Sequence, residues 1–162
     1  MMARPHALPW LLLSLLVIVL DQWSKHVALA ALEPYAPQAV IPGLLNWTLA
    51  FNPGAAFSFL AGADGWQRWL FTALAIGVSL VLAVWLSRTP RGDWRNAAPL
   101  ALVIGGALGN LVDRLRFGHV VDFVQVYWRE WAFPAFNVAD SAISVGAVML
   151  ILFSLWPVRK PA

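Results

Sequence analysis

The residues that could do chemistry in this chain are acidic, basic and amide side chains set among long apolar stretches. They are Asp21, Lys25, Asn52, Asn110, Asp113, Arg114, Asp122, Asn137 and Asp140. The 162-residue chain has no cysteine, which excludes disulfides, thiolate nucleophiles and cysteine-ligated metals. Its three histidines form no HExxH or other paired spacing, so we predict no metal and no cofactor. Any hydrolytic chemistry must then come from serine, lysine or carboxylate side chains.

Two carboxylates a few ångströms apart provide one such chemistry. Two negative charges at this distance repel each other, so one of the two carboxyl groups keeps its proton. The ionised carboxylate takes a proton from a water, and the protonated one polarises the scissile carbonyl and later donates to the leaving amine. Asp122 and Asp140 lie on the two flanks of the last segment between apolar stretches, which could bring them together. They would act as a coupled pair, and the sequence does not say which one holds the proton.

The elements that must position these residues are apolar. Of the residues, 60% are apolar and 12% are charged, whereas a soluble domain is usually about half apolar and about a quarter charged. Each of four apolar segments approaches the ~20 residues that a helix needs to cross a bilayer. They cover about 8–32, 66–86, 97–115 and 138–156. We therefore predict a mainly α integral membrane protein with four transmembrane helices, forming a single membrane-embedded domain over 1–162.

The first apolar segment has an alternative interpretation as a cleavable secretory signal. Arg4, the following apolar run and Ala28-Leu29-Ala30 resemble one. However, Asp21 and Lys25 fall where a signal peptide carries small uncharged residues. These two residues are one helical turn apart on the same face. A retained helix with one polar face at its outer end explains both residues better.

The basic residues near the ends of the spans predict the orientation. Arg4 precedes the first span, and the short loop between the second and third is rich in arginine. By the positive-inside rule this side is cytoplasmic. The residues that mark it are Arg4, Arg88, Arg91, Arg95, Arg159 and Lys160. We expect both termini on the cytoplasmic side.

Two longer segments lie on the opposite side. In residues 33–65, the stretches 39–41 and 45–51 are β-prone and predict a small extracytoplasmic strand platform. Residues 116–137 are rich in aromatics and predict an outer loop that acts as an interfacial lid. The platform, the lid and the outer ends of the helices would then carry all the polar residues named above.

Charge at membrane depth costs at least ~2.5 kcal/mol per residue, so it needs pairing or a function. Each residue has a structural interpretation by itself. Asp113 could pair with Arg114, Asp21 with Lys25, and Asn137 could cap a helix. Gathered at one depth from three helices and two loops, the whole set indicates a site.

Five motifs along the chain resemble those of lipoprotein signal peptidases (signal peptidase II). In order they are Asp21-Gln22-Trp23-Ser24-Lys25, Asn52-Pro53-Gly54-Ala55-Ala56-Phe57, the block GGALGNLVDR at 105–114, Val120-Val121-Asp122-Phe123 and Phe136-Asn137-Val138-Ala139-Asp140-Ser141. Together they cover nearly the whole chain. An N-x-G motif alone is weak evidence, whereas five motifs in the right order are strong.

The resemblance implies an aspartic endopeptidase of the bacterial inner membrane whose active site faces the periplasm. Its substrates would be prolipoproteins with a diacylglyceryl group on the cysteine that becomes the mature N-terminus, among membrane phospholipids. Globomycin-type inhibitors would block it. In the family the catalytic pair corresponds to Asp122 and Asp140.

The other motif residues are expected to support the pair. Arg114 and Asn110 would steady the substrate, and Asp113 would hold Arg114 in place. Asn137 and Asn52 would donate hydrogen bonds to substrate carbonyls. Asp21 and Lys25 would brace the site as an ion pair. Gly54 belongs to the same predicted site.

Four other functions compete with this interpretation. A serine–lysine peptidase cannot use adjacent Ser24 and Lys25, although Ser141 with Lys25 is formally possible. A presenilin-like protease would carry a G-x-G-D motif, which is absent. A metal-dependent lipid transferase would need a tighter carboxylate cluster, and a transporter would place polar residues through the full membrane depth.

The chain has a net charge of +3, but its basic residues are scattered among the apolar segments. We therefore expect no nucleic-acid partner.

Overall fold

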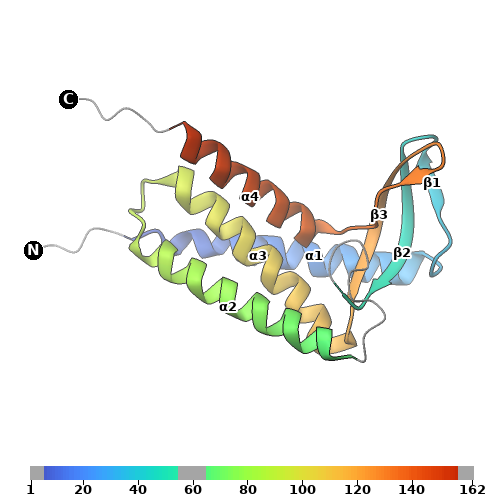
Figure 1. Cartoon of the computed structure of the whole chain (residues 1–162), viewed down its shortest axis with the longest axis horizontal. Coiled ribbons are helices and arrows are strands. Elements are labelled where there is room, and N and C mark those ends of the chain that lie inside the picture. Colours follow the sequence, from blue (N-terminus) through green and yellow to red (C-terminus); the bar gives the residue numbers. More distant parts are fainter. Residues whose placement is uncertain (1–5, 55–64, 157–162) are drawn as a thin grey trace, which may run out of the picture.

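Four helices run side by side, and a small β-sheet stands at one end of them (Figure 1). This computed structural model describes residues 6–54 and 65–156. The elements are the short 3-10 helix η1 (Leu8–Trp10), α1 (Leu11–Ala31), β1 (Gln38–Ile41), β2 (Leu45–Asn52), α2 (Trp66–Arg88), α3 (Trp94–Phe117), β3 (Val120–Trp128), β4 (Trp131–Ala132) and α4 (Val138–Leu155). Parts of the predictions lie outside the described residues, namely Arg4, Ala55-Ala56-Phe57, Arg159 and Lys160.

Four helices in the described part are long and apolar enough to cross a membrane. They are Leu8–Ala31, Trp66–Arg88, Trp94–Phe117 and Val138–Leu155. Their exposed side chains are mostly leucine, valine and isoleucine, which suits contact with lipid. Together with the small antiparallel sheet, they confirm the predicted mainly α membrane fold.

Helix α3 is the centre of the bundle. In its apolar window 72% of the residues are buried, against 28% or fewer in the other three helices. It packs against α1, α2 and α4. Asp93 caps its first turn by accepting a hydrogen bond from the Asn96 N–H at 3.3 Å, so the helix begins three residues before the predicted start at residue 97.

Glycine lets α4 approach α3 closely beside the polar cluster. A Cβ on Gly106 would lie 2.3 Å from the carbonyl oxygen of Ala139. One turn further along α3, a Cβ on Gly109 would lie 2.8 Å from a carboxylate oxygen of Asp21. Small residues permit such contacts between membrane helices, and here they bring α1, α3 and α4 together at one depth.

The sheet differs from the prediction in the segment 116–137. It has the order β1-β2-β3-β4, with each neighbouring pair antiparallel. We expected a loop over 116–137, but this segment contributes β3 and β4, and β3 pairs with β2 from the platform. The sequence VVDFVQVYW of β3 is rich in β-branched and aromatic residues, which favour strands. Asp122 therefore lies in a strand and not in a loop.

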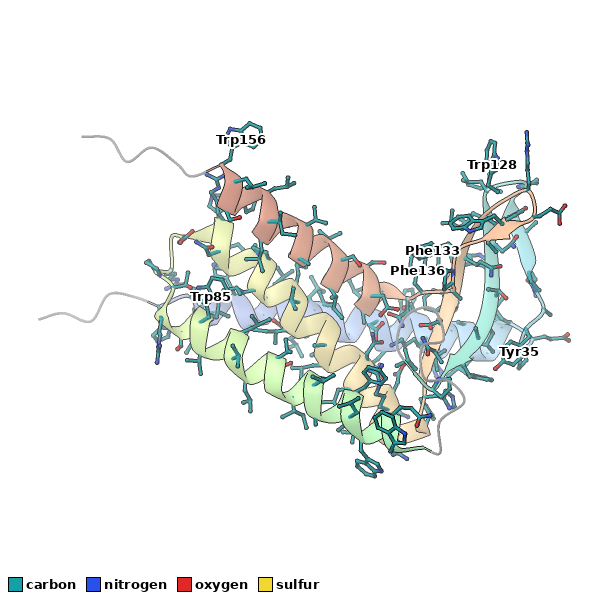
Figure 2. All side chains as sticks on the ribbon, viewed as in Figure 1. Tyr35, Trp85, Trp128, Phe133, Phe136 and Trp156 are labelled. Atoms are coloured by element: carbon teal, nitrogen blue, oxygen red, sulfur yellow. The ribbon has the colours of Figure 1, made fainter. Side chains whose placement is uncertain are left out.

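Aromatic side chains mark both ends of the bundle (Figure 2). Trp85 and Trp156 lie at the end opposite the sheet, and both are exposed. Tyr35, between α1 and β1, and Trp128, at the end of β3, lie at the sheet end and are also exposed. Tryptophan and tyrosine are enriched where hydrocarbon meets headgroups, so the two groups are consistent with four membrane-crossing helices between them.

Candidate active site

The first turn of α4 positions Asp140. Asn137 is the N-cap, and its side-chain oxygen accepts the backbone N–H of Asp140 at 2.9 Å. In return, the Asp140 carboxylate accepts the backbone N–H of Asn137 at 3.3 Å. This reciprocal capping box restrains the Asp140 side chain, and it confirms the expectation that Asn137 caps a helix.

A glycine turn and a strand position Asp122. Gly118 ends α3 with a φ of +82°, a left-handed conformation that glycine adopts without strain. The chain then enters β3, where Asp122 lies opposite Ala50 of β2. Asn52, two residues further along β2, shares a sheet face with Asp122 and donates from Nδ2 to its Oδ2 at 3.2 Å.

Asn137 contacts both predicted catalytic carboxylates. Its Nδ2 donates to Oδ1 of Asp122 at 2.7 Å, while its backbone N–H donates to Oδ2 of Asp140 at 3.3 Å. Asn110 on α3 donates from Nδ2 to Oδ1 of Asp140 at 2.7 Å. The two aspartates, from a strand and from a helix, therefore meet around a shared set of amide groups.

The environment of Asp122 favours its protonated form. Burial raises the pKa of Asp122 to about 7, and the negative charge of Asp140 acts in the same direction. Hydrogen bonds from Asn52 and Asn137 and the charge of Lys25 oppose this rise. Asp122 is 2% exposed, so desolvation prevails over the hydrogen bonds that stabilise the anion.

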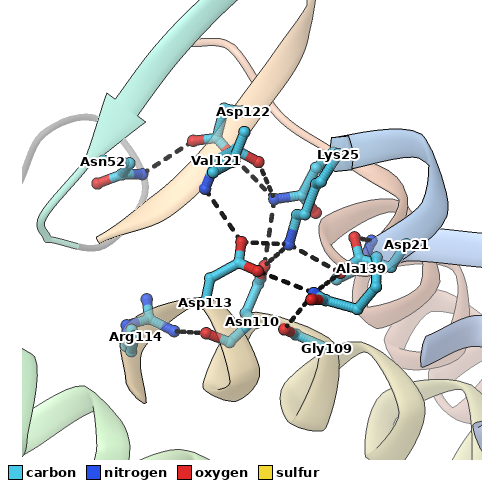
Figure 3. Close-up of polar contacts among 12 residues, drawn as sticks. Asp21, Lys25, Asn52, Gly109, Asn110, Asp113, Arg114, Val121, Asp122 and Ala139 are labelled. Atoms are coloured by element: carbon cyan, nitrogen blue, oxygen red, sulfur yellow. Dashed lines mark hydrogen bonds and ion pairs between the residues drawn. The ribbon is translucent and has the colours of Figure 1, made fainter. Parts of the chain in front are cut away.

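Beside Asp122 lies a buried ionic cluster around Lys25 (Figure 3). The ammonium of Lys25 contacts Asp21 Oδ2 at 2.8 Å, Asp113 Oδ2 at 2.7 Å and Asn110 Oδ1 at 2.9 Å. Three partners match the three N–H donors of a lysine. The predicted pairing of Asp21 with Lys25 is confirmed.

Asp113 departs from its predicted role. Among the described contacts it bonds Lys25, the backbone N–H of Val121 and Gln22 rather than Arg114. It points across the helix interface toward α1, whereas the Arg114 guanidinium donates to the carbonyls of Gly54 at 3.2 Å and Asn110 at 3.4 Å. The expectation that Asp113 holds Arg114 was therefore wrong.

A cavity of about 620 Å³ opens beside the aspartates. Arg114, Asn110, Asn52, Gly54 and Asp140 line it on the polar side. The rest of the lining is largely apolar. It comes from Val120 at the start of β3, from the segment before α4 and from α4 itself, the last two supplying Phe133, Pro134, Ala135, Phe136, Ile143 and Val145, with Ser141 and Ser144. This size and mixture are typical of a ligand site.

The structure brings every predicted site residue within the described part into one contact network or the cavity lining. The expected donation from Asn137 and Asn52 to substrate carbonyls remains a prediction, since in this structure both amides bond Asp122. One participant was missed. Gln22 donates from Nε2 to Asp113 at 2.8 Å, and to Asp21 and the Gly109 carbonyl at 3.2 Å each. Its place between Asp21 and Lys25 on a turn of α1 was the available signal.

Known proteins are similar to this chain along most of its length. The family described as signal peptidase (SPase) II matches residues 13–156. A lipoprotein signal peptidase of Xanthomonas campestris pv. campestris (strain 8004) is 61% identical over 157 residues, which are 97% of this chain and 94% of the relative. Another, from Pseudomonas paraeruginosa (strain DSM 24068 / PA7), is 61% identical over 146 residues, covering 90% and 86% of the two chains.

Solved structures are also similar. One, described as a bacterial membrane enzyme determined by the in meso method at 2.3 Å resolution, has a TM-score of 0.83 with 26% identity, covering 100% of this chain and 99% of the other. A second with the same description, at 1.9 Å resolution, has a TM-score of 0.80 with 28% identity, covering 98% and 99%. Family match, relatives and fold lead to one conclusion: the chain is a peptidase that belongs to the signal peptidase II family.

Proposed function

We propose that this chain is an aspartic endopeptidase that removes signal peptides from diacylglyceryl-modified prolipoproteins, cutting just before the lipidated cysteine. The observation that carries the proposal is the double contact of Asn137 with the carboxylates of Asp122 and Asp140. The relatives' description as lipoprotein signal peptidases supports the substrate class. Prolipoprotein and the surrounding phospholipid would be its partners.

The mechanism follows from the different surroundings of the two carboxylates. Asp140 lines the cavity, whereas Asp122 is buried behind it. With a pKa of about 7, Asp122 is suited to hold the proton that the pair shares. Asp140 would then take a proton from the attacking water, while protonated Asp122 polarises the scissile carbonyl through a hydrogen bond. Asp122 would afterwards give its proton to the leaving amine, and Asp140 would keep the proton from the water, so that the pair again holds one proton.

The cavity suits a substrate with a peptide part and a lipid part. The guanidinium of Arg114 and the amide of Asn110 lie on its polar side, where they would bind peptide or ester carbonyls. Phe136, Ile143 and Val145 supply an apolar side where α4 faces the membrane. We infer that the lipid-modified cysteine enters from the bilayer along this apolar side.

We infer that the protein lies in the bacterial inner membrane with both termini in the cytoplasm and the aspartates facing the periplasm. Arg88, Arg91 and Arg95 lie at the end of the bundle opposite the sheet, which supports a cytoplasmic location for that end. The aspartates lie at the sheet end.

A cleavage assay tests the proposal. Purified full-length protein in phospholipid nanodiscs is incubated with a diacylated prolipoprotein and, separately, with the same chain lacking the lipid. Mass spectrometry should find a new N-terminus at the lipidated cysteine in the first reaction only. Globomycin should abolish it, and EDTA should not. Cleavage at another bond, or only in the presence of a divalent metal, would contradict the proposal.

The contacts of Ser141 and Lys25 disfavour the serine–lysine alternative. The Ser141 hydroxyl donates to the Asn137 carbonyl at 2.9 Å, while Lys25 donates to three other groups. A lysine acting as a base needs a neutral amine directed at the serine. A Ser141→Ala variant should still cleave the diacylated substrate, and loss of all cleavage would favour the serine mechanism.

A further inference from the structure

Asp21 and Asp113 hold the backbone next to the two proposed catalytic residues. Asp21 Oδ1 accepts the N–H of Ala139 at 2.9 Å, and Ala139 immediately precedes Asp140. Asp113 Oδ2 accepts the N–H of Val121 at 3.1 Å, and Val121 immediately precedes Asp122. Each buried carboxylate thus restrains one side of the catalytic pair, the first at the start of α4 and the second at the start of β3.

Lys25 holds these two carboxylates together. Its ammonium lies 2.8 Å from Asp21 Oδ2 and 2.7 Å from Asp113 Oδ2. Asp21 is fully buried and Asp113 is 1% exposed. Two buried carboxylates without a cation would repel each other and pay the full cost of desolvation. Lys25 therefore supplies the positive charge that joins the two carboxylates at these positions.

Lys25 also fixes the orientation of the Asn110 side chain. An ammonium group only donates hydrogen bonds, so the Asn110 oxygen must face it, at 2.9 Å. This leaves the Asn110 Nδ2 to face Asp140, to which it donates at 2.7 Å. The opposite orientation would set two donors against each other and an oxygen against the carboxylate.

We propose that Lys25 is a positioning residue that sets the relative placement of Asp122 and Asp140 through the two carboxylates and the amide that it contacts. This inference rests on the proposed function of that pair. It goes beyond the expectation of a bracing ion pair, because it assigns to each partner of Lys25 a defined contact next to one aspartate.

The charge of Lys25 has a second, separable effect on the pair. Among the described residues, the charged groups around Asp122 are Asp140 on α4, Arg114 on α3 and Lys25 on α1, with amide donors from Asn52 and Asn137. Burial and Asp140 raise the pKa of Asp122, and Lys25 opposes them. Removal of the positive charge should therefore move the pH–rate profile of the pair to higher pH.

Three variants distinguish the effect of the Lys25 contacts on the placement of the two aspartates from the effect of its charge and from a general loss of stability. Lys25→Met removes the charge and all three contacts. Lys25→Arg keeps the charge, but its planar guanidinium cannot make the same three contacts as an ammonium. Ser14→Ala is the control, because it removes another buried hydrogen bond between α1 and α3, from Ser14 Oγ to the Ala101 carbonyl at 2.7 Å.

The measurements are kcat and KM against pH for a diacylated prolipoprotein. Lys25→Met should lower kcat by about 100-fold, since small displacements of reacting groups have effects of this size, with little change in KM. The pH–rate profile of Lys25→Met should move to higher pH by about one unit. Lys25→Arg should lower kcat without moving the profile. Ser14→Ala should change the melting temperature but neither kcat nor the profile.

Amide hydrogen exchange gives a readout that does not depend on activity. In Lys25→Met the peptides containing Val121 and Ala139 should exchange faster than in the wild type, and in Ser14→Ala they should not. Unchanged exchange at both positions would overturn the positioning role even if the wild type proved to have a different activity. If Lys25→Met does not fold, wild-type kcat in Lys25→Arg would overturn it as well.

Discussion

At the scale of single residues, the acidity of Asp122 is the property on which the proposed chemistry depends. A carboxyl group that accepts two amide hydrogen bonds would ordinarily have a low pKa, yet burial and the nearby Asp140 raise the pKa of Asp122 to about 7. The pair can therefore carry one proton at neutral pH. At this pH one carboxylate is available to activate water and one carboxyl group to donate.

We expect kcat/KM for a diacylated prolipoprotein to fall as the pH rises through about 7. The raised pKa of Asp122 means that its proton is present below this pH and lost above it, which leaves two carboxylates and no proton donor. The measurement is initial cleavage rate against pH in nanodiscs, with thermal unfolding as a check that the fold persists. Activity that rose steadily from pH 6 to pH 9 would contradict the assignment.

Asn52 tunes this acidity. Its Nδ2 donates to Asp122 at 3.2 Å and stabilises the ionised carboxylate, so it lowers the pKa of Asp122. Asn52→Ala should move the alkaline limb of the kcat/KM profile to higher pH, by roughly half a unit to one unit. Asn46→Ala on the same strand is a suitable control, because Asn46 bonds Gln125 and not Asp122. A limb that moved to lower pH in Asn52→Ala would show that the contact has the opposite effect.

That these polar residues gather in one cluster could be predicted from the sequence, but several of their contacts could not. Asp21 and Lys25 are one turn apart on one helix, so their pairing follows from helical geometry. The contact of Asp113 with Lys25 depends on how α1 packs against α3, and sequence proximity pointed instead to Arg114. The role of Gln22 was missed for the same reason, since two of its partners lie on α3.

At the scale of secondary-structure elements, close helix packing carries the site. Helix α3 presents small residues to α1 and α4, and this packing places Asn110 within reach of both Lys25 and Asp140. A larger side chain at these contacts would push α4, and with it Asp140, away from the other residues of the site.

Gly106→Ala tests the importance of this packing. The added Cβ would lie 2.3 Å from the Ala139 carbonyl oxygen, so α4 must move. We expect a loss of about 1–3 kcal/mol in stability, typical of overpacking, and a marked fall in kcat. Gly77→Ala on α2 is the matched control, because its Cβ would meet nothing within 4 Å. Equal melting temperatures and rates in the two variants would contradict this account.

The four spans could be predicted because length and apolarity identify a membrane helix directly. Strand β3 could not be separated from an aromatic loop by the same criteria. Its residues are as suited to a loop at the membrane interface as to a strand. The segment forms a strand because it pairs with β2. Predictions for short β elements depend on partners that are distant in the sequence.

At the scale of the whole molecule, the proposed topology rests on the separation of an arginine-rich end from the end that holds the two proposed catalytic aspartates. The arginine-rich connection between α2 and α3 lies at one end, and the sheet and the aspartates lie at the other. By the positive-inside rule, the first end is the one that we propose to be cytoplasmic. A peptidase with this orientation would cut its substrate at the periplasmic face.

The absence of native cysteine allows a direct test of this orientation. Single-cysteine variants Glu130→Cys, beyond β3, and Arg91→Cys, between α2 and α3, both replace exposed residues. In intact spheroplasts a membrane-impermeant maleimide should label Glu130→Cys and not Arg91→Cys. Permeabilised cells should show labelling of both. Labelling of Arg91→Cys alone in intact spheroplasts would reverse the topology.

The central claim is that Asp122 and Asp140 together perform the hydrolysis, and one comparison of rates tests it most directly. Asp122→Asn and Asp140→Asn are each assayed with a diacylated prolipoprotein, beside Asp93→Asn. The control neutralises a carboxylate that caps α3 at the opposite end of the bundle, where asparagine caps equally well.

Both site variants should fold and bind substrate yet cleave about 10²- to 10⁴-fold more slowly than the wild type, as expected when a general acid or base is lost. Asp93→Asn should cleave at the wild-type rate. Cleavage near the wild-type rate by either Asp122→Asn or Asp140→Asn would contradict the account.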